Sequence, residues 1–321
     1  MLILGLQGSP RKKGNTSFLL SAFLKEAERL GARSQVIEVC NKDIVPCKEY
    51  IVCEKKGYCP IDDDMTNQIY PLLRQADIIV AATPVFFYNT TAQLKALIDR
   101  SQTLWARKYK LNLTDPGRNS RRGYLLSVGA TKGKNLFEGL HLTAKYFFDA
   151  VGAAYTGSLT YRHIENIGDM KRHPTVLKDV EEAVAGLLKP LLGRKVILFA
   201  GSKNDCRSQM ASAFTQFFAS DRIEAVGGGN EPAEKVNPLM VDVMKEKGID
   251  MGFRNPMSIT GTLPKQPLDW VINMGDDFSQ SITAADRENW NIPDPSGKNI
   301  DVIRAVRDEI EKKVRTLIDK L

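Results

Sequence analysis

The sequence predicts an α/β fold made of two domains, and three observations carry this prediction. Short apolar segments alternate with amphipathic helical segments through the first part of the chain, which is typical of a parallel sheet covered on both faces. The same alternation restarts after the stretch KPLLG at 189–193. A length of 321 residues also suits two domains better than one. We therefore expect α/β domains at 1–190 and 194–321.

The first domain is predicted from five strand segments. Each is short, rich in Ile, Val and Leu, and bounded by Gly, Pro or polar residues, as buried parallel strands are. They lie at 2–7, 34–40, 76–86, 121–130 and 153–162. Amphipathic periodicity predicts the intervening and final helices at 17–31, 65–75, 90–101, 135–152 and 174–188. This order predicts a doubly wound parallel sheet.

The second domain repeats the pattern on a smaller scale. Strand segments are expected at 193–201, 222–229 and 268–275. Helices are expected at 208–220, 236–249 and 302–321. The two halves share this architecture without an internal sequence repeat, so we predict a second α/β domain of a different type.

Composition and charge narrow the function classes. The chain is 43% hydrophobic and 26% charged, which excludes collagen-like and wholly disordered proteins. Without a membrane-length apolar run or a signal peptide, we expect no membrane partner and a cytoplasmic location. The net charge of +7 suits phosphate-bearing ligands. No basic tract or nucleic-acid module is evident, so we expect no nucleic-acid partner.

The loop after the first strand, GSPRKKGNTS, carries groups that bind a phosphate monoester. Ligands of doubly wound sheets lie outside the carboxyl ends of the strands, where hydroxyls, a guanidinium and helix N-terminal amides would gather here. The candidate residues are Ser9, Arg11, Asn15, Thr16 and Ser17. The alternative is a helix start capped by Asn15 or Thr16 with no ligand. The loop matches neither a Walker loop nor a dinucleotide fingerprint.

Two further loops are expected at the same edge of the sheet. The first follows the third strand and comprises Pro84, Val85, Phe86, Phe87, Tyr88 and Asn89. Its aromatic side chains could flank a flat heteroaromatic ring, although one of the two phenylalanines would be a core residue on the simpler interpretation. The second follows the fourth strand and offers backbone groups for the same ring from Gly129, Ala130 and Thr131.

These loops, in this order and separated by a Cys-rich stretch ending in CPIDDDM, resemble the NAD(P)H-dependent FMN reductase and iron–sulfur flavoprotein family. The resemblance covers roughly 1–190 and implies a flavodoxin-like fold that binds FMN. The first loop would hold the flavin phosphate, and the other two would line the ribityl chain and ring. The resemblance also implies NAD(P)H as electron donor, an acceptor that the sequence does not identify, a homo-oligomer, and flavin-mediated chemistry without a catalytic side chain.

Four of the five cysteines lie close together in the sequence, at Cys40, Cys47, Cys53 and Cys59. Clustered thiols in a reducing compartment suggest a metal or cluster site, or its remnant. This stretch resembles that of the iron–sulfur members of the family, which have a Cys-x-x-Cys-x-x-Cys segment followed by a fourth cysteine. Here Tyr50 stands at the second position of the pattern. We favour a metal-free loop. An iron–sulfur cluster or zinc on Cys47, Cys53 and Cys59 is the alternative, and Asp62–Asp64 are interpreted as a helix cap.

The strand–helix loop of the second domain predicts an oxyanion site, because its amides and one guanidinium could encircle a tetrahedral anion. The candidate residues are Ser202, Lys203, Asn204, Asp205, Cys206, Arg207, Ser208 and the distant Asp294. With the downstream segments NEPAEKVNPLM, DWVINMGDD and NIPDPSG, this loop resembles the low-molecular-weight tyrosine phosphatase family and its arsenate reductases. The resemblance covers about 194–321 and implies a domain of that type.

The attacking cysteine of that family is missing from this loop. The family pattern is Cys-x5-Arg-Ser, and the residue six positions before Arg207 is Gly201. The two relay cysteines of the arsenate reductases correspond to Met274 and Ser281. Because the family's catalysis requires a thiolate, we expect an inactive domain that binds phosphate or arsenate. A structural or dimer-forming remnant is the equal alternative.

Three functions are therefore compared. The first is an FMN-dependent oxidoreductase that moves electrons from NAD(P)H to a small-molecule or protein acceptor and carries an appended oxyanion-binding pseudo-phosphatase domain. The second is a regulatory or sensor protein whose phosphatase-like domain binds arsenate or phosphate. The third is arsenate reductase or phosphatase activity retained by an unusual route. The scattered His141, His163 and His173 are interpreted as surface or interface residues.

Overall fold

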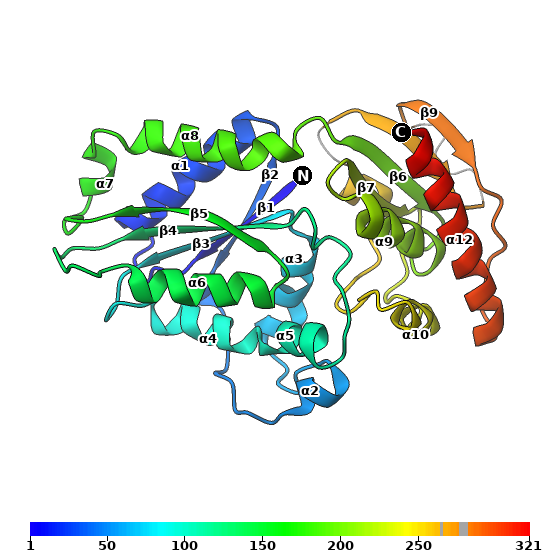
Figure 1. Ribbon diagram of the computed structural model, residues 1–321, viewed down its shortest axis with the longest axis horizontal. Helices are drawn as coiled ribbons and strands as arrows, with labels where there is room; N and C mark the ends of the chain where they lie inside the picture. The colour runs from blue at the N-terminus through cyan, green and yellow to red at the C-terminus, as the bar shows by residue number, and fades with distance from the viewer. Residues whose placement is uncertain (264–265, 276–281) are drawn as a thin grey trace. The chain divides into compact units, whose positions relative to one another are not determined.

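The computed structural model describes residues 1–263, 266–275 and 282–321 (Figure 1). The chain forms two compact units. Unit 1 consists of Met1–Leu111 and Ser120–Pro190, and unit 2 of Asn112–Asn119 and Leu191–Leu321. Each unit holds one parallel sheet, with five described strands in unit 1 and four in unit 2. The predicted α/β class is confirmed.

The sheet of unit 1 has the strand order β2-β1-β3-β4-β5. Its strands are β1 (Leu2–Gln7), β2 (Arg33–Glu38), β3 (Ile78–Pro84), β4 (Arg122–Val128) and β5 (Ala154–Tyr161). This is the order of flavodoxin-like doubly wound sheets, in which the connection reverses direction between β1 and β3. The carboxyl ends of β1, β3 and β4 therefore lie side by side, and the loops that follow them share one edge.

Helices cover both faces of this sheet (Figure 1). One face carries α1 (Asn15–Arg29) and α8 (Val176–Leu188), and the other carries α3 (Tyr70–Gln75), α4 (Ala92–Arg100), α5 (Gln102–Tyr109) and α6 (Glu138–Ala150). The short helices α2 (Val52–Lys56) and α7 (Asp169–Arg172) lie in connections. The predicted helix 65–75 is a π-helical turn, Met65–Ile69, followed by α3. Pro71 has no N–H to donate, which interrupts regular α-helical bonding there.

Unit 2 has the strand order β7-β6-β8-β9. Its strands are β6 (Lys195–Gly201), β7 (Ile223–Gly229), β8 (Leu268–Asn273) and β9 (Ala284–Asn289). The helices are α9 (Arg207–Ala219), α10 (Pro238–Glu246), α11 (Ile259–Thr262) and α12 (Ile300–Lys320). The main core lies between the sheet and α9, α10 and α12, and includes Phe199, Phe214 and Trp290. The sequence did not predict β9, because its sequence AADREN has three consecutive charged residues and no alternating apolar face.

A segment from the first half of the sequence belongs to unit 2. Within Asn112–Asn119, Thr114 forms a parallel bridge with Ile249. The Thr114 amide donates to the Gly248 carbonyl at 2.7 Å, and the Asp250 amide donates to the Thr114 carbonyl at 2.8 Å. The chain therefore enters unit 2 twice, an arrangement that a single boundary near 190 does not describe.

None of the helices in the described ranges is both long and apolar enough to cross a membrane.

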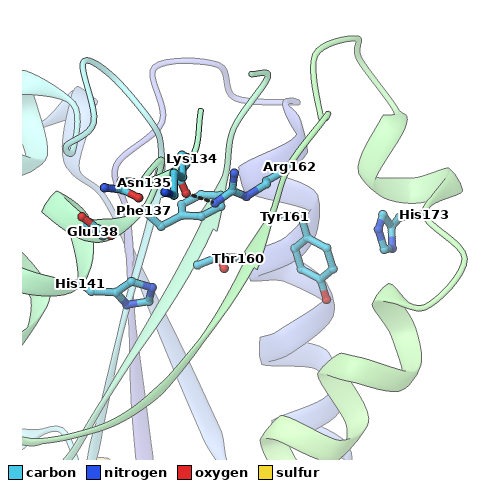
Figure 2. Close-up of a pocket in the computed structure, with 9 residues that line it drawn as sticks. All are labelled: Lys134, Asn135, Phe137, Glu138, His141, Thr160, Tyr161, Arg162 and His173. Atoms are coloured by element: carbon cyan, nitrogen blue, oxygen red, sulfur yellow. Dashed lines mark hydrogen bonds between the residues drawn. The ribbon is translucent and has the colours of Figure 1, made fainter. Parts of the chain in front are cut away.

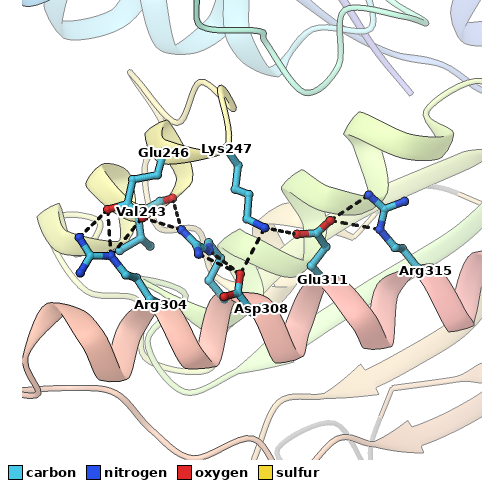
Figure 3. Close-up of polar contacts among 8 residues, drawn as sticks. Val243, Glu246, Lys247, Arg304, Asp308, Glu311 and Arg315 are labelled. Atoms are coloured by element: carbon cyan, nitrogen blue, oxygen red, sulfur yellow. Dashed lines mark hydrogen bonds and ion pairs between the residues drawn. The ribbon is translucent and has the colours of Figure 1, made fainter.

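An ion-pair network fixes α12 against α10 (Figure 3). Arg307 is 6% exposed and donates to the Val243 carbonyl and to Glu246, both at 2.8 Å. Arg304 pairs with the same carboxylate at 2.7 Å. The Arg304 and Arg307 hydrogen bonds lower the pKa of Glu246. The network continues along α12 through Lys247, Asp308, Glu311 and Arg315.

We expect this network to make unit 2 sensitive to acid. The pKa of Glu246 is lowered by its arginine hydrogen bonds, and the Arg307 hydrogen bond lowers that of Asp308. A carboxylate with a lowered folded-state pKa stabilises the fold above its unfolded pKa of about 4, and this stability disappears as pH falls through the folded value. Calorimetry from neutral pH to about pH 3 should show a falling unfolding temperature. Glu246→Gln should flatten the fall, and an unchanged slope would contradict this account.

Candidate functional site

The sheet order brings the three predicted flavin loops to one edge of unit 1. Loop 8–14 follows β1, loop 85–91 follows β3, and loop 129–137 follows β4. The amide of Gly8 donates to the Ala82 carbonyl at 2.8 Å, and the Thr91 hydroxyl donates to the Gly8 carbonyl at 2.7 Å. A Cβ at Gly8 would lie 2.8 Å from Leu94 Cδ2, so this close approach of the first two loops requires glycine.

The N-terminus of α1 has no side-chain cap. Its N-cap residue is Gly14, and no acidic residue lies in the first turn. The alternative interpretation, in which Asn15 or Thr16 caps this helix, is therefore wrong. The amides that begin α1 have no side-chain acceptor, and Arg11–Lys13 are exposed beside them. Such a helix end, with its positive dipole and nearby cations, is suited to an anion.

Three of the predicted phosphate-binding side chains already have partners within the protein, and one of them is Ser9, whose Oγ accepts from the Arg11 amide at 3.2 Å. Asn15 Nδ2 donates to the Asn166 carbonyl at 2.8 Å, while Asn15 Oδ1 accepts from the amides of Gly168 and Met170, both at 3.2 Å. Ser17 Oγ donates to the Lys12 carbonyl at 2.9 Å. The Asn15 side chain thus links α1 to the connection after β5. Only the backbone amide of Asn15 is left to bind a ligand at the loop.

Loop 85–91 forms a tight aromatic hairpin. Phe86 and Asn89 exchange both backbone hydrogen bonds at 2.9 Å, and the two residues between them adopt left-handed conformations, with φ of 47° at Phe87 and 61° at Tyr88. The prediction that one phenylalanine belongs to the core is wrong, because Phe86 is 48% exposed and Phe87 is 102% exposed. The turn directs both rings away from the core.

The third loop is fixed from β5. The Gly129 amide donates to the Tyr161 carbonyl at 2.8 Å, and the Ile164 amide donates to the Gly129 carbonyl at 3.1 Å. The Arg162 guanidinium donates to the carbonyls of Gly133 and Lys134 and lies 5.7 Å from the Phe137 ring. Ala130 and Thr131 remain exposed. Arg162 therefore orders the part of the loop that follows the predicted flavin contacts.

A pocket that the sequence did not predict opens beside this loop (Figure 2). Its volume is about 530 Å³, and it lies at the carboxyl end of β5. The lining residues are Lys134, Asn135, Phe137, Glu138, His141, Thr160, Tyr161, Arg162 and His173. His173 packs edge-on against Tyr161, and His141 Nδ1 lies 2.7 Å from the Tyr155 hydroxyl. Two of the three histidines thus line one cavity, which their separate sequence positions did not indicate.

The cysteine-bearing stretch forms a second pocket in unit 1. Cys47, Cys53 and Cys59 line a cavity of about 480 Å³ together with Tyr50 and Arg100. Burial raises the pKa of Cys53, and the neighbouring Cys59 and Cys47 raise it further. Cys40 lies elsewhere, since its Sγ donates to the Gly8 carbonyl at 3.6 Å. Of the four cysteines that are close together in the sequence, three therefore line one pocket.

Arg100, which lines this pocket, belongs to a buried ion pair. Arg100 Nη1 lies 2.5 Å from Asp63 Oδ2, with the two side chains 1% and 0% exposed. Arg100 Nη1 also donates to the Val45 carbonyl at 2.7 Å. Burial works to raise the pKa of Asp63, but its hydrogen bonds to Arg100 and to the Val45 amide outweigh burial and lower it. Asp63 also accepts from the Met65 amide at 3.0 Å, whereas Asp64, the N-cap residue of the helical turn, makes no side-chain capping bond.

In unit 2, loop 201–208 is held by a buried asparagine. Asn204 has a left-handed φ of 51°, and its Nδ2 donates to Ser208 Oγ at 2.8 Å. Its Oδ1 accepts from the Met257 amide and from Gln209 Nε2, both at 2.9 Å. An asparagine tolerates this conformation better than most residues. The loop keeps its curved path through these side-chain bonds.

Arg207 is engaged with backbone carbonyls beside this loop. Its Nη1 donates to Met274 at 2.8 Å and to Ile292 at 2.6 Å, and its Nη2 lies 3.8 Å from Asp294. Cys206 is 3% exposed and packs in the core. Burial raises the pKa of Cys206 to about 12, so this thiol is protonated at neutral pH. Met274 is buried, and Ser281 lies outside the described residues.

Comparisons with known proteins find a different family match for each half. Residues 1–132 match the NADPH-dependent FMN reductase family, and residues 196–321 match the low-molecular-weight phosphotyrosine protein phosphatase family. The second half is 32% identical over 128 residues to a putative arsenate reductase of Halobacterium salinarum, covering 38% of this chain and 89% of that protein. The chain belongs to the low-molecular-weight phosphatase family through residues 196–321.

Other relatives agree with this division. Arsenate reductase 2 of Staphylococcus epidermidis is 31% identical over 129 residues, covering 39% of this chain and 97% of that protein. An iron-sulfur flavoprotein of Methanosarcina thermophila is 38% identical over 132 residues, covering 41% of this chain and 65% of that protein. The chain thus spans less than two thirds of this relative. It joins a segment that matches the FMN reductase family model to a segment of the phosphatase family.

The phosphatase-family segment has a glycine where the strand enters its anion loop. A Cβ built at Gly201 would lie 3.6 Å from Ser208 Oγ, an ordinary contact distance. The position thus has room for a side chain that faces the loop, although the chain places none there.

Proposed function

We propose that this chain is an FMN-dependent oxidoreductase that takes electrons from NAD(P)H, passes them to a small-molecule or protein acceptor, and carries an oxyanion-binding domain that does not turn over substrate. The observation that supports it best is the meeting of two features at one sheet edge. The uncapped N-terminus of α1 lies beside Arg11–Lys13, and the exposed aromatic hairpin Phe86–Asn89 follows the neighbouring strand.

The residues of this edge fit FMN. Arg11, Ser9 and the first amides of α1 would hold its phosphate, since these amides have no side-chain acceptor of their own. The hairpin and Gly129–Thr131 would line the ribityl chain and ring. Bound FMN supplies hydride and electron transfer, and the protein supplies orientation and exclusion of competing reactions.

The pocket in Figure 2 suits the electron donor. It adjoins the third loop, and Lys134, Arg162 and the aromatic ring of Phe137 provide the positive charge and flat surface that a phosphate-bearing nicotinamide nucleotide requires. His141 and His173 lie on opposite sides of this pocket. We assign NAD(P)H to this position on the strength of that chemistry.

The decisive experiment is an absorption spectrum of the full-length protein incubated with FMN and passed through a desalting column. We expect a retained flavin band and consumption of NADH or NADPH in the presence of a quinone or ferricyanide. A protein that stays colourless with excess FMN would end this proposal. Retained flavin without NAD(P)H oxidation would indicate that the protein is an electron carrier and not a reductase.

Arg11→Ala should weaken FMN binding. A hydrogen bond to a charged group contributes about 1.5–3 kcal/mol, which corresponds to roughly 10–100-fold in dissociation constant. Arg29→Ala, at the other end of the same helix and paired there with Glu26, is the matched control and should bind FMN normally. Fluorescence quenching of FMN gives both constants. Equal constants for the two variants would remove Arg11 from the site.

A four-thiolate iron–sulfur cluster does not fit the residues that are present. Three cysteines line the pocket, Tyr50 lies among them, and Cys40 is bonded to Gly8 in the phosphate loop. Relatives of the first half are named iron-sulfur flavoproteins. The function proposed for this chain nevertheless includes no electron transfer through a cluster.

The sensor function is favoured by one observation, the intact support of the anion loop by Asn204. If this domain binds phosphate or arsenate, the ligand should raise the unfolding temperature, because it binds only the native state. Asn204→Ala should abolish the rise by releasing the loop. If an anion raises the unfolding temperature but does not change NAD(P)H oxidation, the domain binds the anion without regulating the enzyme. If the unfolding temperature does not rise, the domain is structural.

A further inference from the structure

The pocket lined by Cys47, Cys53 and Cys59 holds an unusual combination of groups. Three thiols line it, and Tyr50, which stands at the second cysteine position of the sequence pattern, lines it as well. Cys53 and Cys59 are partly buried and Cys47 is exposed, so an incoming species meets Cys47 first. A site of this kind provides three soft donors and no fourth.

The charged wall of the pocket restricts what the three thiols can bind. Arg100 is the buried cation, and Asp63 already neutralises it through a bidentate pair of 2.5 and 3.1 Å. A zinc ion in a structural site takes a fourth ligand, which these three thiols do not supply. Trivalent arsenic with three thiolates is neutral and needs no fourth ligand.

One polar atom in this wall lacks a partner. Arg100 Nε is buried and donates to no acceptor in the described part of the chain. A buried donor without an acceptor is unfavourable, and such atoms point to a group that binds there. A sulfur atom carrying partial negative charge in the same pocket is the acceptor that a thiolate complex would supply.

We propose that Cys47, Cys53 and Cys59 form a binding site for trivalent arsenic. Arsenous acid, As(OH)₃, would exchange three hydroxyl groups for three sulfurs: three S–H and three As–O bonds break, three As–S and three O–H bonds form, and three waters leave. Arsenic stays trivalent throughout, so the step needs no oxidant or reductant. This inference does not depend on the proposed flavin chemistry.

Uptake requires the thiols to move closer together. Among the described residues, no three Cys, His, Asp or Glu side chains already surround one point. The connection between Cys47 and Cys53 is the segment that can adjust. It includes Glu49 and Ile51 in left-handed conformations, with φ of 54° and 60°, and the second is unfavourable for a β-branched residue. A different path for this segment would relieve that strain.

The test is arsenite titration of the full-length protein, reduced with a phosphine and handled without oxygen, because dithiols compete for arsenite. Bound arsenite is measured by near-ultraviolet As–S absorption. It is also measured by the number of thiols that no longer react with a disulfide reagent. We expect one equivalent to protect three of the five cysteines. Protection of fewer than three, or zinc displacing arsenite at equal concentration, would overturn the assignment.

Variants separate this site from the other thiols. Cys53→Ser should weaken arsenite binding by about 10²–10⁴-fold, because each further thiol of a chelating site binds intramolecularly. Cys40→Ser is the matched control and should retain full affinity, since that thiol lies against Gly8. Equal affinity in the two variants contradicts the proposal. Far-ultraviolet circular dichroism of the same samples shows whether each variant is folded, and arsenite protection is scored independently of flavin content.

Discussion

Arg100→Met is expected to destabilise unit 1 by about 3–5 kcal/mol, because it leaves the Asp63 carboxylate buried without its cation. Both side chains are almost completely buried, and their pair joins α4 to the segment before α3. For a unit of this size, the loss corresponds to a fall of about 6–20 °C in unfolding temperature. Calorimetry or urea denaturation of the full chain measures it.

The same helix provides the control. Lys95 and Asp99 form an ion pair of 2.5 Å on α4 with both side chains exposed by more than 40%. Exposed pairs contribute about 0–1 kcal/mol, so Lys95→Ala should change the stability little. Combining Arg100→Met with Asp63→Asn should restore part of the loss by removing the unpaired charge. Similar effects for the exposed and the buried substitution would show that the Arg100 pair is not what fixes this region.

Gly201→Cys is expected to give the second unit an aryl phosphatase activity, which we predict that the natural chain lacks. The site has room, since a Cβ at this position meets Ser208 Oγ at 3.6 Å. A thiol there would face the loop amides and the N-terminus of α9, which favour the thiolate. We expect aryl phosphate hydrolysis at least about a hundredfold above that of the natural chain, since a nucleophile contributes several orders of magnitude.

Two further variants identify the source of that activity. Gly201→Cys combined with Arg207→Ala should lose it, because the guanidinium is needed for the anion once it leaves the carbonyls of Met274 and Ile292. Gly201→Cys with Cys206→Ala should keep it, because the Cys206 thiol is buried and has a pKa of about 12. Aryl phosphate hydrolysis by the natural chain that depends on Cys206 would refute the inactive-loop interpretation.

The site was predictable where it depends on local pattern and strand order. Apolar runs predicted β1, β3 and β4, and parallel pairing placed their following loops at one edge. The roles of individual side chains were less predictable. Asn15 is a good phosphate ligand by type, but its amide group bonds across the chain to Asn166, Gly168 and Met170.

The sequence by itself determined the two α/β units and the position of each candidate loop, because periodicity is a local property. The prediction that Gly201 stands where the family has a cysteine also rests on residue identity alone. Only the tertiary structure decided that Cys40 leaves the thiol cluster, that Phe86 and Phe87 face solvent, and that Thr114 pairs with Ile249. Each of these depends on which distant backbone satisfies a hydrogen bond or covers an apolar surface. That choice is made by the whole fold, through contacts between residues far apart in the chain.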